Sequence, residues 1–333
     1  MRKVEVDGEV IAMKKQCNDY YTKTGLKLHY TIICGKSEIP FVLIHGQGMC
    51  GEDYQSVYEQ LSEKYTLYLV DCFGHGESEK KEALYRCNII GDTIAELIEN
   101  EIGKPCIISG HSSGGILAAY VAGKIPKLIK GLLLEDPPFF NVMPGEFENT
   151  FVYKDSFRVM HEFMNQTEEN EYIVYNIKHG YIFNYLGQRF FGKEWSSNLA
   201  QEAKLKLEKT PNKIPELDKV STKSLHGYAY MDKFDMLFAE TFYTGRWFEG
   251  VVQEEILKSV ECPTIYLKAK TRYGKDGVLW AANTEESAER VMKLLKNGYR
   301  KTVASGHDIH YDKPRHFLKA MKLLEKKIKK TDK

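Results

Sequence analysis

Short apolar runs alternate with segments of helical periodicity along most of the chain. Runs that are apolar on both faces begin at Phe41, Tyr65, Cys106, Gly131, Thr264 and Tyr299. Apolar residues spaced three and four apart predict helices over residues 53–64, 88–100, 113–124, 285–296 and 314–329. Two earlier runs, 19–23 and 26–34, are expected to pair across a Thr24-Gly25 turn. Strands without a polar face, alternating with helices, indicate an α/β fold whose mostly parallel sheet is flanked by helices.

The strand predicted at residues 106–110 ends in a serine between glycines, Gly110-His111-Ser112-Ser113-Gly114. This Gly-x-Ser-x-Gly pattern lies between a strand and a helix, where a tight turn strains the serine backbone and exposes its hydroxyl. A glycine-serine helix cap without chemistry has the same local pattern. The strand–turn–helix setting favours Ser112 as a nucleophile.

A serine hydroxyl is a weak nucleophile and needs a neighbouring base. The segment VASGHDIHYDKP supplies His307 and His310. His307 follows the last predicted strand through a Ser-Gly turn, so it reaches the same edge of the sheet as Ser112 and is the predicted base. His310 is expected to pack or to support the site. Two histidines three residues apart without a clear third ligand predict no metal site.

Two aspartates compete to orient this histidine. Asp136 ends the strand that begins at Gly131 and precedes two prolines, whereas Asp276 lies in the long loop after the next strand. Each has a structural alternative, Asp136 as a cap of the Pro-Pro turn and Asp276 as an exposed Asp-Gly turn. Loop geometry favours Asp136, and Asp276 remains the alternative.

Charge that develops on a carbonyl oxygen during acyl transfer needs hydrogen-bond donors. The glycine-rich turn HGQG at residues 45–48 follows a buried strand and can present backbone N–H groups. We expect the amides of Gln47 and Ser113 to form the oxyanion hole. The segment VDCFGHGES at residues 70–78 is expected to pack beside this turn without a catalytic role.

Together these motifs resemble the α/β-hydrolase fold superfamily, and within it the serine hydrolases that carry a helical cap. The matching pieces are HGQG at 45–48, DCFGHGES at 71–78, GHSSG at 110–114, and Gly306-His307 followed by Pro314. The resemblance implies a Ser–acid–His triad in that chain order. In most members the acid follows the strand after the cap, which favours Asp276. In a minority it precedes the cap, which favours Asp136, and the loop around Asp276 is longer than usual.

The stretch between the strands that begin at Gly131 and Thr264 is mostly helical in pattern and holds more than half of the aromatic residues. By resemblance it is a cap (lid) of residues 138–262 over an α/β core of residues 1–137 and 263–333. Most of its aromatic rings must hold the cap together, and a few should line a largely apolar pocket. Phe139, Phe140 and Trp247 are the predicted lining residues.

Composition narrows the range of partners and locations. A net charge of +1 over 333 residues gives no reason to expect nucleic acid or an anionic membrane as a partner. Seven scattered cysteines without a Cys-x-x-Cys pair argue against a disulfide framework and favour a reducing cytoplasm. We find no apolar leader or membrane-length run, so a cytoplasmic protein is expected. The expected partner is a small-molecule substrate, and no metal or organic cofactor is required.

The expected activity is hydrolysis of a small or medium-sized, partly apolar ester or lactone through an acyl-enzyme intermediate. An amide, or a C–C bond next to a carbonyl, could react with the same residues. Because fold alone does not decide function, a ligand receptor or scaffold with little turnover is the alternative of a different class.

Overall fold

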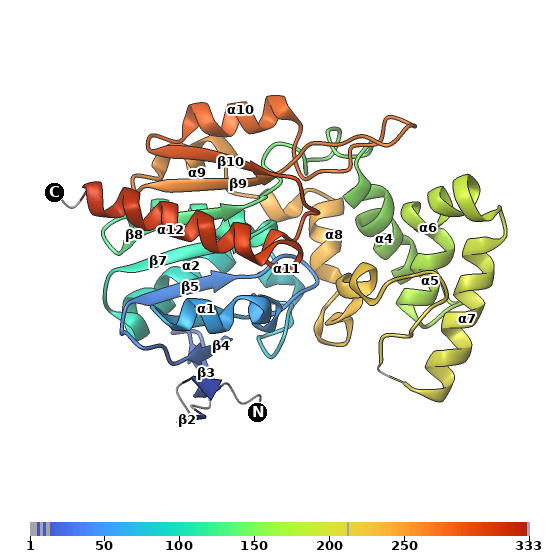
Figure 1. The fold of residues 1–333 in the computed structure, drawn as a ribbon, viewed down its shortest axis with the longest axis horizontal. Coiled ribbons are helices and arrows are strands. Elements are labelled where there is room, and N and C mark those ends of the chain that lie inside the picture. Colours follow the sequence, from blue (N-terminus) through green and yellow to red (C-terminus); the bar gives the residue numbers. More distant parts are fainter. Residues whose placement is uncertain (1–4, 7–8, 11–13, 212, 332–333) are drawn as a thin grey trace.

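A mostly parallel sheet forms the centre of the molecule (Figure 1). The computed structural model describes residues 5–6, 9–10, 14–211 and 213–331. The strands of the sheet are β3 (Lys15–Tyr21), β4 (Lys27–Ile33), β5 (Pro40–Ile44), β6 (Thr66–Val70), β7 (Cys106–His111), β8 (Ile129–Glu135), β9 (Thr264–Ala269) and β10 (Gly298–Val303). Their order is β10-β9-β8-β7-β5-β6-β4-β3, and β4 runs against its two neighbours while the other pairs are parallel. A separate antiparallel pair joins β1 (Glu5–Val6) to β2 (Glu9–Val10).

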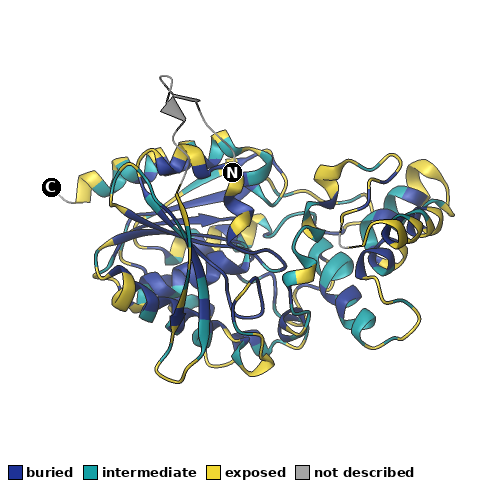
Figure 2. Ribbon diagram, turned by 90° about the horizontal axis from the view of Figure 1, so that it is seen from below, coloured by how far each residue is buried: buried dark blue, intermediate teal, exposed yellow. Residues whose placement is uncertain are grey.

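Helices cover both faces of this sheet because its strands carry apolar side chains that point both ways. In β5, Val42 and Ile44 share a core with α2, α3 and α10, whereas Phe41 and Leu43 share the opposite core with α1 and α12. Dark buried strands between helices with exposed outer faces are visible in Figure 2. These helices are α1 (Tyr58–Ser62), α2 (Cys87–Leu97), α3 (Ser113–Lys124), α10 (Glu285–Leu294) and α12 (Pro314–Thr331). The α/β class predicted from the sequence is confirmed.

The helices predicted at 53–64 and 88–100 differ in detail from those observed. The first is a 3₁₀ helix, η1 (Gly51–Ser56), followed by α1, and the second ends in a π turn, η3 (Ile98–Ile102). In η1 the Tyr54 hydroxyl donates to the carbonyl of Ile44 at 2.9 Å. The 3₁₀ turn η1 places the buried Tyr54 hydroxyl within reach of its acceptor. Tertiary contacts of this kind outweigh the α-helical periodicity of the sequence. A further 3₁₀ turn, η2 (Glu82–Leu84), precedes α2.

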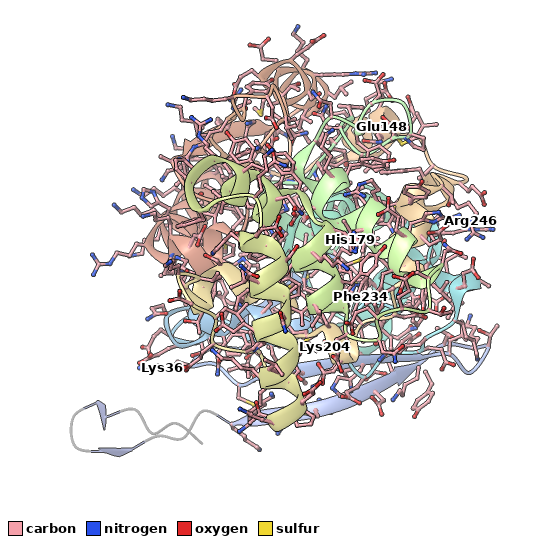
Figure 3. The ribbon with its side chains drawn as sticks, turned by 90° about the vertical axis from the view of Figure 1, so that its right-hand side faces the viewer. Lys36, Glu148, His179, Lys204, Phe234 and Arg246 are labelled. Carbon is pink, nitrogen blue, oxygen red and sulfur yellow. The ribbon has the colours of Figure 1, made fainter. Side chains whose placement is uncertain are left out.

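Between β8 and β9 the chain is mostly helical, and residues 138–262 of this stretch are called the insertion, while the sheet with its flanking helices is called the sheet domain. The α-helices of the insertion are α4 (Arg158–Met164), α5 (Tyr172–His179), α6 (Tyr181–Leu186), α7 (Trp195–Lys209), α8 (Leu237–Tyr243) and α9 (Gln253–Ser259). Short helical turns join them, namely η4 (Tyr153–Phe157), η5 (Gly187–Phe191), η6 (Thr222–Tyr228), η7 (Met231–Lys233) and η8 (Arg246–Phe248). Helices α4 to α7 lie beyond the carboxyl ends of the strands, and they face the viewer in Figure 3.

Part of the insertion has an apolar core of its own, which includes Ile173, Ile177, Leu199, Ala203 and Leu225. Its last helix, α9, instead packs into the core that α3 shares with the sheet. The insertion is therefore held both by its own packing and by the sheet domain. Across the described residues, none of the helices combines the length and the apolar character needed to span a membrane.

Candidate active site

Ser112 occupies the turn between β7 and α3, with φ 53° and ψ −123°. Its N–H donates to the carbonyl of Glu135 at 2.9 Å, and its carbonyl accepts from the N–H of Gly115 at 2.9 Å. A non-glycine residue with positive φ is strained, and this strain is typical of a serine at a strand–helix elbow. The backbone of Ser112 therefore has the conformation that its motif predicts.

Two glycines permit this turn because backbone atoms occupy the space where side chains would point. A Cβ on Gly110 would lie 2.0 Å from the carbonyl oxygen of Gly114, and a Cβ on Gly114 would lie 2.3 Å from that of His45. Both distances are far inside van der Waals contact, and neither backbone can move without moving a core element. The glycines of the motif are thus sterically required.

His307 and Asp136 form a hydrogen-bonded pair at the carboxyl edge of the sheet. His307 Nδ1 lies 2.8 Å from Asp136 Oδ2, and the carboxylate is fully buried while the imidazole is 40% exposed. Asp136 Oδ1 accepts from the N–H of Ala269 at 2.9 Å, which holds the carboxylate in place. Burial opposes charging of His307, but the hydrogen bond and charge of Asp136, with Asp308 nearby, outweigh it and raise the histidine's pKa. In this geometry a carboxylate can orient an imidazole and stabilise its cation.

Asp276, the alternative partner, contacts a different part of the molecule. Its carboxylate accepts from the Tyr181 hydroxyl at 2.8 Å and from the N–H of Val278 at 3.3 Å, and the residue is exposed. The long loop after β9 folds back on itself, so that Tyr273 forms an antiparallel β-bridge with Leu279. The backbone of Leu279 in turn forms hydrogen bonds with the backbone of residues 149 and 151. This pairing carries Asp276 to α6, and Asp136 is the aspartate in contact with His307.

A set of buried side chains shapes the loop of residues 45–51 beside Ser112. His75 Nε2 accepts from the N–H of Gly48 at 3.1 Å, and Asp71 Oδ1 accepts from the N–H of Gly51 at 2.8 Å. Segment 71–78 therefore supports this loop, in the position that the sequence predicted for it.

Ser112 borders a cavity between the sheet and the insertion, and the backbone donors predicted for the oxyanion hole border it too. Gln47 and Ser113 both line this cavity. Across the described residues, neither backbone N–H has a protein acceptor. The side chain of Gln47 adds a buried Oε1 atom that also has no partner among these residues. Two backbone donors next to a serine at the start of a helix suit a developing oxyanion.

His310 lies fully buried behind the site and contacts a carboxylate on each side. Its Nδ1 is 2.9 Å from Glu135 Oε1, and its Nε2 is 3.1 Å from Asp53 Oδ2. Its backbone N–H also donates to Glu135 at 2.6 Å. Burial opposes the imidazolium, but Glu135 and Asp53 outweigh it and raise the pKa of His310 well above the ordinary value. His310 thus supports the segment that follows His307.

Sequence reasoning missed two members of this cluster. Asp53 Oδ1 lies 2.7 Å from Nε2 of His226, which belongs to the insertion and stacks on Tyr311 with ring centroids 3.7 Å apart. Neither Asp53 nor His226 belongs to a motif, and only the fold brings them together.

One group within this cluster has the composition of a metal site. Ligand atoms of Asp53, His111 and His310 lie within 4.8 Å of one another. Both nitrogens of His310 already face carboxylates, so ion pairing accounts for the positions of Asp53 and His310.

A cavity of about 720 Å³ connects Ser112 and His307 with the insertion. Most of its wall is apolar, and the insertion contributes lining residues from η4, α4, α5, α6, η5, α7, η6, η7 and α8. Large apolar side chains in that wall include Phe151, Phe157, Met160, Ile182, Phe183, Leu186, Phe190, Phe191, Trp195, Phe242 and Trp280. The cavity has the size and character of a small-molecule site.

The prediction that Phe139, Phe140 and Trp247 line the pocket is wrong, because all three pack between the insertion and the sheet domain. Phe139 and Trp247 are fully buried, and Trp247 stacks on Phe242 with ring centroids 4.5 Å apart. The ring of Phe140 lies 4.0 Å from the Arg290 guanidinium. None of the three is among the residues that line the cavity.

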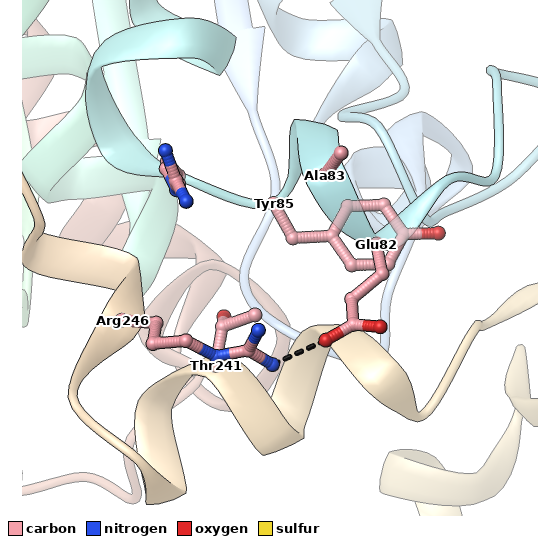
Figure 4. A pocket seen from close by; sticks show the side chains of 6 residues that line it. Glu82, Ala83, Tyr85, Thr241 and Arg246 are labelled. Carbon is pink, nitrogen blue, oxygen red and sulfur yellow. Dashed lines mark hydrogen bonds and ion pairs between the residues drawn. The ribbon is translucent and has the colours of Figure 1, made fainter.

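A second, smaller hollow of about 250 Å³ lies between the segment before α2 and α8 (Figure 4). Arg246 pairs with Glu82 across it, and Arg86 pairs with Glu249 at 3.0 Å. Its charges are therefore paired internally, and its described lining residues include no serine or histidine.

The alpha/beta hydrolase family model matches residues 41–320, which include Ser112, Asp136 and His307. The pimeloyl-[acyl-carrier protein] methyl ester esterase of Yersinia pseudotuberculosis is 28% identical over 108 residues, which are 32% of this chain and 40% of that protein. The match thus spans less than half of that relative's length.

Two solved structures share the fold along nearly their whole length. A putative aryl esterase from Burkholderia cenocepacia has a TM-score of 0.62 at 17% identity, covering 93% of this chain and 97% of its own. A thermophilic esterase from Thermogutta terrifontis has a TM-score of 0.59 at 17% identity, covering 94% and 99%. Because the family model matches most of this chain, the chain belongs to the alpha/beta hydrolase family.

Proposed function

We propose that this hydrolase cleaves carboxylic esters through an acyl-enzyme intermediate on Ser112. The observation that carries the proposal is the 2.8 Å pair of His307 and buried Asp136, at the same cavity as a strained serine. The esterases among its relatives and structural neighbours support the choice of an ester.

In the first step Ser112 Oγ attacks the ester carbonyl carbon, and His307 takes the hydroxyl proton and passes it to the leaving alcohol. In the second step a water attacks the acyl-enzyme with His307 again as base, which frees the acid and restores Ser112. Asp136 holds the imidazole in one tautomer and stabilises its charged form. The N–H groups of Gln47 and Ser113 bind the oxyanion in both steps.

The cavity suggests a small or medium-sized, partly apolar ester or lactone. The insertion, residues 138–262, acts in this proposal as a cap that excludes water and contacts the part of the substrate away from the reacting carbonyl.

The test is labelling of the pure protein with a fluorophosphonate probe, mapped by peptide mass spectrometry, alongside turnover of simple esters. We expect the probe on Ser112, and we expect Ser112→Ala and His307→Ala each to lower kcat by about 10⁶-fold with no further loss when combined. Labelling without turnover would favour a receptor of this fold. Wild-type activity in Ser112→Ala would overturn the site.

A further inference from the structure

Asp155 is the one acidic residue that the insertion contributes to the described lining of the cavity. Asp155 lies in η4, and its Oδ1 accepts from the N–H of Ile182 at 2.7 Å. Burial raises the pKa of this carboxyl to about 6, although the amides of Ile182 and Tyr181 and the charge of Arg158 act against the rise. A partly buried carboxylate therefore lies at a cavity whose wall is mostly apolar.

No basic side chain neutralises Asp155 among the described residues. The Arg158 guanidinium donates to both Glu162 oxygens, at 2.8 and 2.6 Å, and to the carbonyls of residues 154 and 179. Lys219 is the one lysine or arginine among the described lining residues, and its side chain is 59% exposed near Asp218. A carboxylate in this setting is poorly solvated and lacks a counter-ion.

The polar neighbours of Asp155 in the wall are already paired with one another. The Asn176 amide group donates to the carbonyl of Asp155 at 2.6 Å and to the Tyr172 hydroxyl at 3.1 Å, and its Oδ1 accepts from the Tyr228 hydroxyl at 2.6 Å. These bonds hold the polar side chains of the wall in place. The Asp155 carboxylate remains as the charged acceptor of this part of the wall. The tyrosine rings beside it also suit a cation.

A structural explanation for Asp155 is that it caps the start of α6. One oxygen with the N–H of Ile182 is sufficient for that contact, and an asparagine could make it equally well. Capping does not require a full charge inside the substrate cavity.

We propose that Asp155 binds a protonated amine on the part of the substrate remote from the cleaved ester, so that the natural substrates are amino-substituted esters. This inference rests on the proposed ester hydrolysis. A substrate ammonium group would supply the missing counter-ion, and a substrate carboxylate at the same point would be repelled.

The experiment compares kcat/KM for esters of increasing length that end in methyl, hydroxyl, ammonium or carboxylate groups, placed on the acyl or on the alcohol side. It uses wild type, Asp155→Asn and Asp276→Asn, at a pH above the carboxyl's pKa of about 6. Asp155→Asn keeps the acceptor for Ile182, and thermal unfolding checks its fold. Asp276→Asn is the matched control, because it removes a charge from an exposed loop that contacts α6 outside the cavity lining.

At one length, wild type and Asp276→Asn should prefer the ammonium ester over the methyl ester by about ten- to a hundred-fold, as for a hydrogen bond to a charged group. Asp155→Asn should abolish the preference, retain turnover of the methyl ester, and improve turnover of the carboxylate ester. An equal preference in wild type and Asp155→Asn, or no preference in wild type, would overturn the inference while leaving ester hydrolysis intact.

A second readout does not depend on turnover. Alkylammonium ions titrated calorimetrically into Ser112→Ala should bind more tightly than into Ser112→Ala combined with Asp155→Asn. Equal binding would overturn the inference. Absence of Ser112 labelling and of any ester turnover would instead count against the proposed function.

Discussion

At the scale of single residues, the geometry of Asp136 decides which carboxylate meets His307. Asp136 has φ 45°, its N–H donates to the carbonyl of Leu267 at 2.8 Å, and its Oδ1 accepts from Ala269. Strand β9 therefore hydrogen-bonds to both the backbone and the side chain of Asp136, the residue that follows β8. This double contact directs the second carboxylate oxygen to His307, a result that no spacing rule would supply.

Asparagine substitutions should separate the two aspartates. Asp136→Asn keeps the shape but lets the imidazole take the wrong tautomer, so kcat should fall by about 10⁴-fold. Asp276→Asn should leave kcat close to the wild-type value, because Asp276 contacts Tyr181 and not His307. Steady-state kinetics on folded protein checks both, and a collapse of kcat in Asp276→Asn alone would show that the loop rearranges to supply the acid.

At the scale of elements, a buried ion cluster joins η1, β8 and α11 (Ile309–Asp312). His310 in α11 contacts Glu135 at the end of β8 and Asp53 in η1, and all three side chains are fully buried. The carbonyl of His310 also accepts from the Ser56 hydroxyl at 2.7 Å. The cluster thus fixes the segment after His307 to two elements of the core.

Removal of the His310 side chain should leave Glu135 without its charged partner and Asp53 with His226 alone. His310→Ala should lower the free energy of unfolding by about 3–5 kcal/mol, as expected when one member of a buried charged set is lost. His316→Ala is the control, since His316 makes no side-chain hydrogen bond among the described contacts, and it should change stability by less than about 0.5 kcal/mol. Urea unfolding followed by circular dichroism measures both values. Similar losses in the two variants would contradict a charged cluster.

The difference in free energy of unfolding between wild type and His310→Ala should depend on pH, and the pKa shifts give the sign of this dependence. Because the pKa of His310 is raised on folding, its contribution is full below the unfolded value of about 6.5 and is lost as the pH rises through the folded value. The pKa of Asp53 is lowered, although burial acts against this, by His310 and His226, so its contribution is present above about 3.9 and is lost at lower pH. The stability gap between wild type and His310→Ala should therefore be wider near about pH 6 than near about pH 10.

At the scale of the whole molecule, the cavity lies where the insertion and the sheet domain meet. His226 links the two, since it pairs with Asp53 in η1 and stacks on Tyr311 in α11. The insertion is thereby tied to the same buried cluster that supports the segment of His307.

Loss of this link should loosen the insertion more than it destabilises the protein. In His226→Ala we expect faster proteolysis and faster amide hydrogen exchange within residues 222–228, together with a raised KM for ester substrates. His179→Ala is the matched control, because His179 packs against Tyr175 inside the insertion. Unchanged exchange in His226→Ala would mean that apolar packing alone holds the insertion.

Local patterns were enough to predict the α/β sheet and the backbone of the serine turn. Helix α3 spans the predicted residues 113–124, and glycine sterics at 110 and 114 impose the elbow wherever the motif joins a strand to a helix. His307 could be singled out because it follows a strand whose carboxyl end must lie on the same edge as Ser112. These features depend on neighbours in the chain, which the sequence records directly.

Only the tertiary structure showed that Asp136 and not Asp276 contacts His307, excluded Phe139, Phe140 and Trp247 from the cavity wall, and revealed the Asp53–His310–Glu135 cluster. Each outcome depends on where a loop or an insertion comes to rest against distant segments. That position follows from the packing of the whole chain, because burial and charge pairing act between residues that are close in space but far apart in sequence.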